Sequence, residues 1–358
     1  MPSPVNHSAK VSSFLSSAKI TASDSAIEKQ EENCWKKELT QATTSVSQLL
    51  IKLGLEKYTQ VTDTESSFQC LVTQSYINKI QTGNIDDPLL QQVLPLSKEK
   101  NPNIQKGGTT NPVGDLEAEV TQGLLHKYHG RALIINTGAC AIHCRYCFRR
   151  SYPYQQSSCT TKALNKTLSY LNSHPEIDEI ILSGGDPLIL DNEKLSSIIK
   201  QLEQIKHLQT LRIHTRIPVV LPARITNKLL NLLISSRFQT VMVIHSNHAN
   251  ELQSIEQEKL QLLHQAGVTL LNQSVLLKGI NDDADTLIAL SKRLLQCKTL
   301  PYYLHLLDPV LGAMHFSTGQ KSAQNLLQEI TAQLPGYLVP KLVQEIAGSK
   351  SKTAIFRI

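Results

Sequence analysis

Short apolar runs alternate with amphipathic stretches along the chain from about residue 130 onward. The apolar runs have the length of strands, and the stretches between them repeat their apolar positions with helical spacing. The expected strands are 132–136, 179–183, 210–214, 240–245, 268–277 and 302–307, and the expected helices are 161–173, 191–204, 226–235, 251–265, 284–297 and 320–333. Six strand–helix units in succession predict parallel strands joined by right-handed crossovers.

Two α/β architectures fit this alternation, an incomplete (β/α)6 barrel and a doubly wound sheet, and periodicity alone does not separate them. A closed eight-unit barrel typically needs ~250 residues or more. The polar residues favour the incomplete barrel, because each distinctive polar cluster follows the end of a strand, where barrels carry their chemistry.

The part before this alternation has a different composition. Its first residues are rich in serine, alanine and threonine, which predicts a flexible tail, and a helical region and a linker are expected to follow. Asp87 and Pro88 indicate a capped helix start within that region. The expected divisions are 1–33 for the tail, 34–112 for the helical region and linker, 120–335 for the barrel and 336–358 for a C-terminal segment.

Three cysteines, Cys140, Cys144 and Cys147, follow the first expected strand with C-x3-C-x2-C spacing. Three thiolates on a tight loop can hold three irons of a [4Fe–4S] cluster and leave the fourth iron open for a ligand. The alternative is a structural zinc site, which needs a fourth ligand. Because His143 lies between two of the cysteines, it is poorly placed to complete a zinc tetrahedron, and the cluster is favoured.

The rest of the composition limits the class of protein. The other cysteines, Cys34, Cys70, Cys159 and Cys297, are scattered, and a chain of 358 residues does not need disulfides. No apolar run approaches the ~18 residues of a membrane span. The net charge of +6 comes without runs of lysine or arginine, so nothing indicates nucleic-acid binding. We expect a cytoplasmic protein, since an oxygen-sensitive cluster survives in a reducing compartment.

Two further motifs carry candidate chemistry. Gly184, Gly185 and Asp186 follow the second expected strand, where glycines allow the backbone to approach a ligand and expose its amides. Lys352 lies in a Gly/Ser-rich segment near the C-terminal end and could form a Schiff base with pyridoxal 5′-phosphate (PLP). Each motif is weak by itself, because such a turn is common and a lysine near a terminus is usually a solvated charge.

Arginine is absent before Arg131, and the later arginines gather at strand ends. They include Arg149, Arg150, Arg212, Arg216 and Arg224. The planar guanidinium suits carboxylate and phosphate, so this distribution indicates anionic ligands at the rim of the barrel. Arg212 and Arg224 are interpreted as ordinary surface or barrel-edge ion pairs.

The cysteine spacing resembles that of radical S-adenosylmethionine (SAM) enzymes, and the motifs together resemble the lysine 2,3-aminomutase family. The motifs that carry this resemblance are 125–131, 140–150, 183–188, 216–225, 271–277, 301–308 and 336–352. Within the family, the chain is most similar to the short EpmB branch, which makes (R)-β-lysine for the modification of elongation factor P. The motifs typical of that branch are 86–93, 123–129 and 147–150.

The resemblance implies a role for each candidate residue. Cys140, Cys144 and Cys147 would hold the cluster, Gly184, Gly185 and Asp186 the methionine amino group of SAM, and Lys352 the PLP. Arg149 would bind the substrate carboxylate, Asp308 and Glu345 its distal ammonium, and Lys127, Arg131, Arg216 and Gln273 the cofactor phosphate. Lys350 competes with Lys352, but the spacing from Glu345 and the following Thr353 favour Lys352.

The implied activity is that of an isomerase, an L-lysine 2,3-aminomutase that converts L-α-lysine to (R)-β-lysine through a 5′-deoxyadenosyl radical. It implies an electron donor such as flavodoxin or ferredoxin, and a functional link to elongation factor P and its lysine ligase. Two positions depart from the larger enzymes of the family: Glu345 replaces an aspartate, and Asp283 stands where a zinc cysteine is expected. The chain also ends at Ile358 without a cysteine-rich tail, so we expect no zinc and no oligomer built through it.

Two alternatives remain. One is a radical SAM, PLP-dependent aminomutase for another amino acid, such as glutamate or arginine, although two acids at Asp308 and Glu345 argue against glutamate. The other is a non-catalytic iron–sulfur or zinc-binding module of the translation machinery. A brown protein that gains an absorbance with PLP would support the enzyme, and a colourless protein with one bound zinc would support the module.

Overall fold

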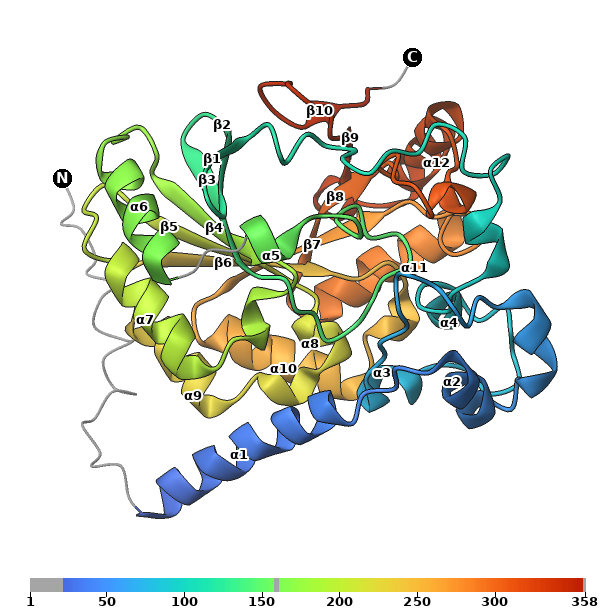
Figure 1. Cartoon of the computed structure of the whole chain (residues 1–358), viewed down its shortest axis with the longest axis horizontal. Coiled ribbons are helices and arrows are strands. Elements are labelled where there is room, and N and C mark those ends of the chain that lie inside the picture. Colours follow the sequence, from blue (N-terminus) through green and yellow to red (C-terminus); the bar gives the residue numbers. More distant parts are fainter. Residues whose placement is uncertain (1–21, 158–160, 357–358) are drawn as a thin grey trace.

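A computed structural model describes residues 22–157 and 161–356 of the 358-residue chain. Its ten strands form one sheet in which the strand order follows the sequence from β1 to β10 (Figure 1). Six neighbouring parallel strands form the centre: β3 (Arg131–Thr137), β4 (Glu179–Gly184), β5 (Thr210–Thr215), β6 (Gln239–His245), β7 (Thr269–Val275) and β8 (Leu300–His305). β1 and β10 stand at opposite ends of this order, so the predicted incomplete (β/α)6 barrel is confirmed and the doubly wound sheet is excluded.

Helices connect the parallel strands and cover the outer face of the sheet (Figure 1). They are α6 (Thr161–Asn172), α7 (Asn192–Leu202), α9 (Asn227–Ser235), α10 (Ser254–Gln265), α11 (Ala284–Gln296) and α12 (Gln320–Gln333). Polar side chains fix several starts, because an N-cap oxygen satisfies a free backbone N–H of the first turn. Asp283, which stands at the expected zinc-cysteine position, is such a cap: its Oδ1 accepts from the Thr286 amide at 2.8 Å.

Short helices interrupt the loops at the ends of the strands. They are α5 (Tyr154–Ser157), α8 (Ile217–Val220), η4 (Pro187–Ile189), η5 (Pro222–Arg224), η6 (Ala249–Glu251), η7 (Met314–Phe316) and η8 (Gly336–Leu338). Among the described residues, no helix combines the length and apolar character needed to cross a membrane.

The N-terminal region is less helical than expected. Its elements are α1 (Ala22–Thr40), α2 (Val46–Leu53), η2 (Glu56–Val61), α3 (Gln74–Ile77), α4 (Pro88–Gln91) and η3 (Ser97–Lys100). The expected start of α4 is confirmed, because Asp87 Oδ1 accepts from the amides of Leu89 and Leu90 at 2.8 and 3.0 Å. The expected tail boundary at residue 33 is wrong, since α1 begins at Ala22; residues 1–21 lie outside the described residues.

This region shares the core of the barrel. Trp35, Leu49 and Leu50 are fully buried and belong to the same apolar cluster as Ile180 and Leu211 of the parallel strands. The composition of residues 97–112, rich in Lys, Asn, Gly and Pro, predicts a linker or an exposed loop, but Glu99 and Gln105 within this range are buried. Burial of these polar side chains follows from their partners on the barrel, which the local sequence does not reveal.

Four short strands extend the parallel sheet at its two edges. β1 (Glu119–Thr121) and β2 (Leu124–Tyr128) pair antiparallel ahead of β3, while β9 (Lys341–Gln344) pairs parallel to β8 and antiparallel to β10 (Thr353–Ala354). Leu338, Leu342 and Ile355 of the C-terminal segment are buried in a second apolar cluster with β8 and α12. The segment after residue 335 is therefore packed on the barrel next to β8.

Candidate active site

A cavity of about 410 Å³ lies at the carboxyl ends of the parallel strands, a size typical of small-molecule sites. Every residue that the sequence singled out as a site residue lines it: Lys127, Arg131, Cys140, Cys144, Cys147, Arg149, Gly184, Gly185, Asp186, Arg216, Gln273, Asp308, Glu345 and Lys352. These residues come from both edges and the middle of the sheet. The fold therefore brings together residues that are more than two hundred positions apart.

The three cysteines belong to a tight loop that follows β3, in which the Cys147 amide donates to the Cys144 carbonyl at 3.0 Å. Burial raises the pKa of Cys140, and the neighbouring Cys147 raises it further. Burial and Cys144 raise the pKa of Cys147 to about 11. Among the described residues, no three His, Cys, Asp or Glu side chains converge on one point as ligands of a single metal ion. Three thiols spread along one wall are a donor set that suits a larger, polynuclear cluster.

His143, the candidate fourth zinc ligand, is held by the N-terminal region. Its Nδ1 lies 2.9 Å from the Gln69 carbonyl oxygen, and its ring stacks on Phe68 at 5.0 Å between centroids. This position agrees with the prediction that His143 does not complete a tetrahedron with the cysteines.

Gly184 and Gly185 bring the end of β4 against the cysteine loop. Gly184 has φ +122°, and a Cβ on either residue would lie within 2.4 Å of the carbonyl oxygen of Thr137 or Ala139. Only glycine fits such an approach. The expectation of exposed amides is wrong for Gly185, whose N–H donates to the Thr137 carbonyl at 2.7 Å. Both glycines thus allow β4 to approach the loop backbone, while they also line the cavity.

Asp186 connects the ends of β4 and β5. Its carboxylate accepts from Thr215 Oγ1 and from the Arg216 amide, both at 2.7 Å, and from the Leu188 amide at 3.1 Å. Burial raises the pKa of Asp186 to about 6 in spite of these hydrogen bonds. A ligand ammonium would have to share the oxygens with donors that are already present.

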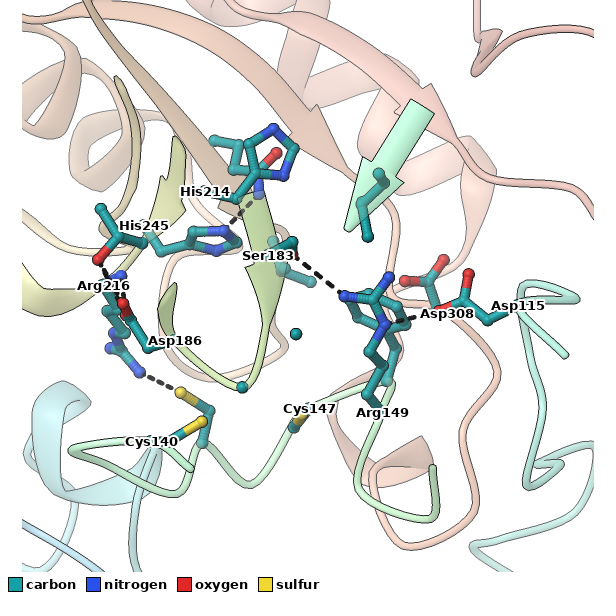
Figure 2. A pocket seen from close by; sticks show the side chains of 18 of the residues that line it. Asp115, Cys140, Cys147, Arg149, Ser183, Asp186, His214, Arg216, His245 and Asp308 are labelled. Atoms are coloured by element: carbon teal, nitrogen blue, oxygen red, sulfur yellow. Dashed lines mark hydrogen bonds and ion pairs between the residues drawn. The ribbon is translucent and has the colours of Figure 1, made fainter. Parts of the chain in front are cut away.

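Arg216 is joined to the cysteine loop, a position that the sequence did not indicate. Its guanidinium donates to Cys144 Sγ at 2.7 Å and to Gln92 Oε1 and Glu251 Oε2, both at 2.8 Å. These partners leave the expected phosphate contact without support from the geometry. Figure 2 shows this guanidinium directed at the sulfur of the loop.

The opposite end of the cavity is built around Glu345. Its Oε2 lies 2.9 Å from Lys352 Nζ and its Oε1 lies 2.9 Å from Lys127 Nζ. Burial opposes ionisation, but Lys352 and Lys127 lower the pKa of Glu345 to about 2. Lys350 is exposed and is not part of the cavity wall, which supports the choice of Lys352.

The expected phosphate ligands are already engaged. Lys127 Nζ contacts the Val113 carbonyl at 2.7 Å and Asp115 at 2.6 Å in addition to Glu345, so its three N–H donors all have acceptors. The Cζ atom of Arg131 lies 4.9 Å from the centroid of the Tyr128 ring. The Gln273 amide contacts the His245 ring. A phosphate would have to displace at least one acceptor from Lys127.

Asp115 is a central site residue that the sequence analysis missed. Its Oδ2 lies 2.6 Å from Arg149 Nε, and its Oδ1 lies 2.6 Å from Lys127 Nζ. Figure 2 shows Arg149 between Asp115 and Ser183, whose hydroxyl accepts at 3.2 Å. Burial raises the pKa of Asp115, but Arg149 and Lys127 outweigh this effect and lower it. No local motif marks Asp115, because its partners Lys127 and Arg149 are distant in the sequence.

Asp308 has a buried Oδ1 with no hydrogen-bond partner among the described residues. Burial and the nearby charge of Glu345 raise the pKa of Asp308 to about 7. A buried acceptor without a partner is costly, so this oxygen fits a cationic or hydrogen-bonding ligand.

Three histidines of the cavity wall were also missed: His214 on β5, His245 on β6 and His305 on β8. Burial lowers the pKa of each of them, so the rings are neutral at pH 7. Two of them could have been found, because His214 and His245 stand at the ends of the expected strands 210–214 and 240–245; His305 lies inside the expected strand 302–307 and ends only the observed β8.

The two arginines interpreted as ordinary ion pairs differ from each other. Arg212 pairs with Glu179 on the neighbouring strand, with Nε 3.0 Å from Oε1, as expected. For Arg224 the interpretation is wrong, because it is fully buried and donates to the carbonyls of Leu188 and Leu190 at 2.8 and 2.9 Å. Arg224 thereby fixes the loop that follows the Gly-Gly-Asp turn.

Residues 129–217 match a family model described as a 4Fe-4S single cluster domain. L-lysine 2,3-aminomutase of Haemophilus influenzae is 45% identical over 327 residues, which are 90% of this chain and 96% of that protein. The enzyme of the same name from Escherichia coli is 43% identical over 90% of this chain and 94% of its own length. That from Clostridium subterminale is 32% identical over 90% and 78%. Among solved structures, a radical SAM methyltransferase from Sphaerobacter thermophilus matches 62% of this chain and 68% of its own, with a TM-score of 0.46 and 14% identity.

Proposed function

The chain belongs to the L-lysine 2,3-aminomutase family, and we propose that it moves the α-amino group of L-lysine to the β-carbon to give (R)-β-lysine. The activity is that of an isomerase, and the family uses a [4Fe–4S] cluster, SAM and PLP. The observation that carries the proposal is that three cysteines, an amine and an unpaired acid line one cavity.

Specific side chains are proposed to hold each cofactor. Cys140, Cys144 and Cys147 would bind the cluster, and Lys352 would bind PLP through its amine. The donor sets fit these groups, since the thiols share one wall and Lys352 Nζ points into the cavity from the C-terminal segment. When bound, the cluster and SAM supply a 5′-deoxyadenosyl radical for hydrogen abstraction, and PLP supplies the conjugated system that carries the migrating nitrogen.

SAM and the cofactor phosphate have weaker candidates. We retain Gly184, Gly185 and Asp186 as the SAM contacts, because they adjoin the cysteine loop. Lys127, Arg131 and Gln273 remain candidates for the phosphate, while the partners of Arg216 give its phosphate role no support.

The remaining residues would orient the substrate. Arg149 offers its guanidinium to the lysine carboxylate while Asp115 and Ser183 hold it in place. Asp308 and Glu345 would receive the distal ammonium, and Asp308 offers a buried oxygen that has no partner in the described part of the chain. Fixing both charged ends of lysine holds the α- and β-carbons in one position, which favours migration over side reactions.

The test is anaerobic incubation of the reconstituted protein with SAM, PLP, dithionite and L-lysine, with β-lysine measured by chromatography and mass spectrometry. We expect β-lysine from the wild type and none from Lys352→Ala or Cys144→Ala. Absence of β-lysine from a preparation that contains full iron and PLP would contradict the proposal. Incubation with glutamate or arginine instead tests the alternative aminomutase.

We further propose that the product serves the modification of elongation factor P, as the similarity to the short branch of the family suggests. Released β-lysine would then be attached by a separate ligase in the cytoplasm. A flavodoxin or ferredoxin would supply the electron. A gene for an elongation factor P lysine ligase beside this gene would support the link, and a ligase that refuses β-lysine would contradict it.

A further inference from the structure

The cysteine loop is attached to the N-terminal region on both sides of Cys144. The His143 amide donates to the Leu71 carbonyl at 2.9 Å, and the Arg145 amide donates to the Gln92 carbonyl at 2.8 Å. These are backbone contacts between segments that lie fifty or more positions apart. The path of the loop therefore depends on residues outside the barrel.

Arg145, between Cys144 and Cys147, strengthens this attachment. It is 0% exposed, and its Nε and Nη2 contact the two carboxylate oxygens of Glu99 at 2.8 and 2.5 Å. Its Nη1 donates to the Phe68 carbonyl at 2.5 Å, and Nη2 also reaches Ser66 Oγ at 3.1 Å. A guanidinium with a bidentate acid and further acceptors is fixed in direction as well as in charge.

Glu99 also holds the far side of the loop. Arg150 Nη2 lies 2.9 Å from Glu99 Oε2, and Arg150 Nη1 donates to the Arg145 carbonyl at 3.2 Å. Both guanidiniums lie over the Phe68 ring, with the Cζ atoms of Arg145 and Arg150 at 4.9 and 4.7 Å from the ring centroid. One buried carboxylate thus lies between two arginines that flank Cys147 and reduces the repulsion between them. Without it, two buried like charges would face each other, which is unfavourable.

We propose that residues 66–99 form a brace that holds the cysteine loop in its metal-binding shape before any cluster is present, with Glu99 as the positioning residue. The inference rests on the proposed function only in taking Cys140, Cys144 and Cys147 as the cluster ligands. It assigns a task to the N-terminal region, whose sequence carries no chemistry of its own. It also predicts that the brace serves the cysteine end of the cavity and leaves the Lys352 end unaffected.

The test uses Glu99→Gln in the full-length protein. Hydrogen exchange of the metal-free protein is measured for peptides that cover residues 140–150 and for the rest of the barrel. We expect exchange in the loop to rise roughly tenfold while the helices α9–α12 keep their protection. After anaerobic reconstitution, iron per chain should fall, while the absorbance of bound PLP should match the wild type. If Glu99 only stabilised the fold as a whole, Glu99→Gln would lower protection throughout the barrel and would reduce bound iron and bound PLP together.

Glu179→Gln is the matched control, because Glu179 of β4 is a largely buried acid with its own arginine, Arg212, whose Nε lies 3.0 Å from Glu179 Oε1. Neither residue belongs to residues 66–99 or to the cysteine loop. We expect it to leave loop exchange and iron unchanged. Should Glu99→Gln not fold, Arg145→Lys keeps the charge but loses the bidentate contact, and the same selective loss of iron is expected. Unchanged loop exchange and iron, an equal change throughout the barrel, or the same effect from Glu179→Gln would overturn the brace. A wild type with full iron that makes no β-lysine would instead contradict the proposed function.

Discussion

The cysteine loop and the C-terminal segment line the same cavity but are supported in different ways. The loop is held by backbone contacts from residues 71 and 92 and by the fully buried Arg145. In the C-terminal segment, Ile346 is 46% exposed, β10 has only two residues, and Lys352 is held through its ion pair with Glu345. We infer that the cluster site is built in advance, whereas the lysine site is the adaptable end.

The two regions also differ in how they balance charge. At the cysteine end, guanidiniums face thiols and carboxylates in direct contact, as with Arg216 and Cys144. At the lysine end, Glu345 has two ammonium partners, while Asp308 has an oxygen with none among the described residues. In the first arrangement each of these charged groups has a partner of opposite charge. The second leaves Asp308 Oδ1 without a partner among the described residues, and a cationic substrate would supply one.

The largest expected effect is that of Cys144→Ala. Two thiolates cannot secure the cluster, so iron and the cleavage of SAM should be lost. The PLP absorbance should remain, because Lys352 comes from the opposite end of the cavity. Iron analysis and the visible spectrum of the reconstituted variant measure both quantities. Loss of PLP together with iron would show that the two ends are not independent.

Lys352→Ala should give the reverse pattern. The absorbance of bound PLP and the turnover should disappear, while iron per chain stays at the wild-type value. Among the described residues the Lys352 side chain contacts Glu345 and Tyr303, neither of which belongs to the cluster loop. Borohydride reduction followed by peptide mass spectrometry locates the modified lysine. Lys350→Ala is the control and should behave like the wild type. If Lys350 carries the cofactor instead, the register inferred from Glu345 is wrong by two residues.

The sequence predicted the repeating part of this molecule well and the connecting parts poorly. All six parallel strands lie within a few residues of their expected positions, because each is a buried apolar run that needs no distant partner to be recognised. β1 and β10 are too short and too exposed to give such a signal. The N-terminal region lost most of its expected helix, since its apolar residues pack on the barrel and follow that surface rather than a helical repeat.

The candidate site shows the same division. Residues with a motif, such as Cys140 and Lys352, were found, and they line the cavity. Asp115 and Glu99 were missed, because a single acid in a loop has no pattern until its arginine is known to be beside it. Gly185 was predicted because a glycine lets the backbone approach a ligand, but in the structure it approaches the backbone of Gly138 and Ala139.

Asp115→Asn tests how much the substrate end depends on buried pairing. The amide cannot neutralise Arg149 and Lys127, so the guanidinium should lose its fixed direction toward the substrate carboxylate. A hydrogen bond between charged groups contributes ~1.5–3 kcal/mol, which corresponds to a rise of about 10–100-fold in KM for lysine with a smaller change in kcat. Glu193→Gln, which breaks an exposed pair with Lys228, is the control and should leave KM unchanged. An unchanged KM in Asp115→Asn would contradict the positioning of Arg149.

The last prediction concerns stability rather than activity, and is a pH dependence of opposite sign for the two acids of the lysine end. Burial raises the pKa of Asp308 from 3.8 to about 7, so the native ligand-free protein retains a proton that the unfolded chain releases. The contribution of Asp308 to stability is therefore present below pH 4 and lost as the pH rises to 7. Glu345, with its pKa lowered from 4.5 to about 2, contributes above pH 4.5 and loses this contribution as the pH falls toward 2. One pKa unit corresponds to about 1.4 kcal/mol. The free energy of unfolding of Asp308→Asn, measured in urea, should therefore rise by ~2–4 kcal/mol relative to that of the wild type between pH 4 and 8. If the free energy of unfolding depended on pH in the same way for Asp308→Asn and the wild type, Asp308 would ionise freely in the native protein and would have a hydrogen-bond partner in solution.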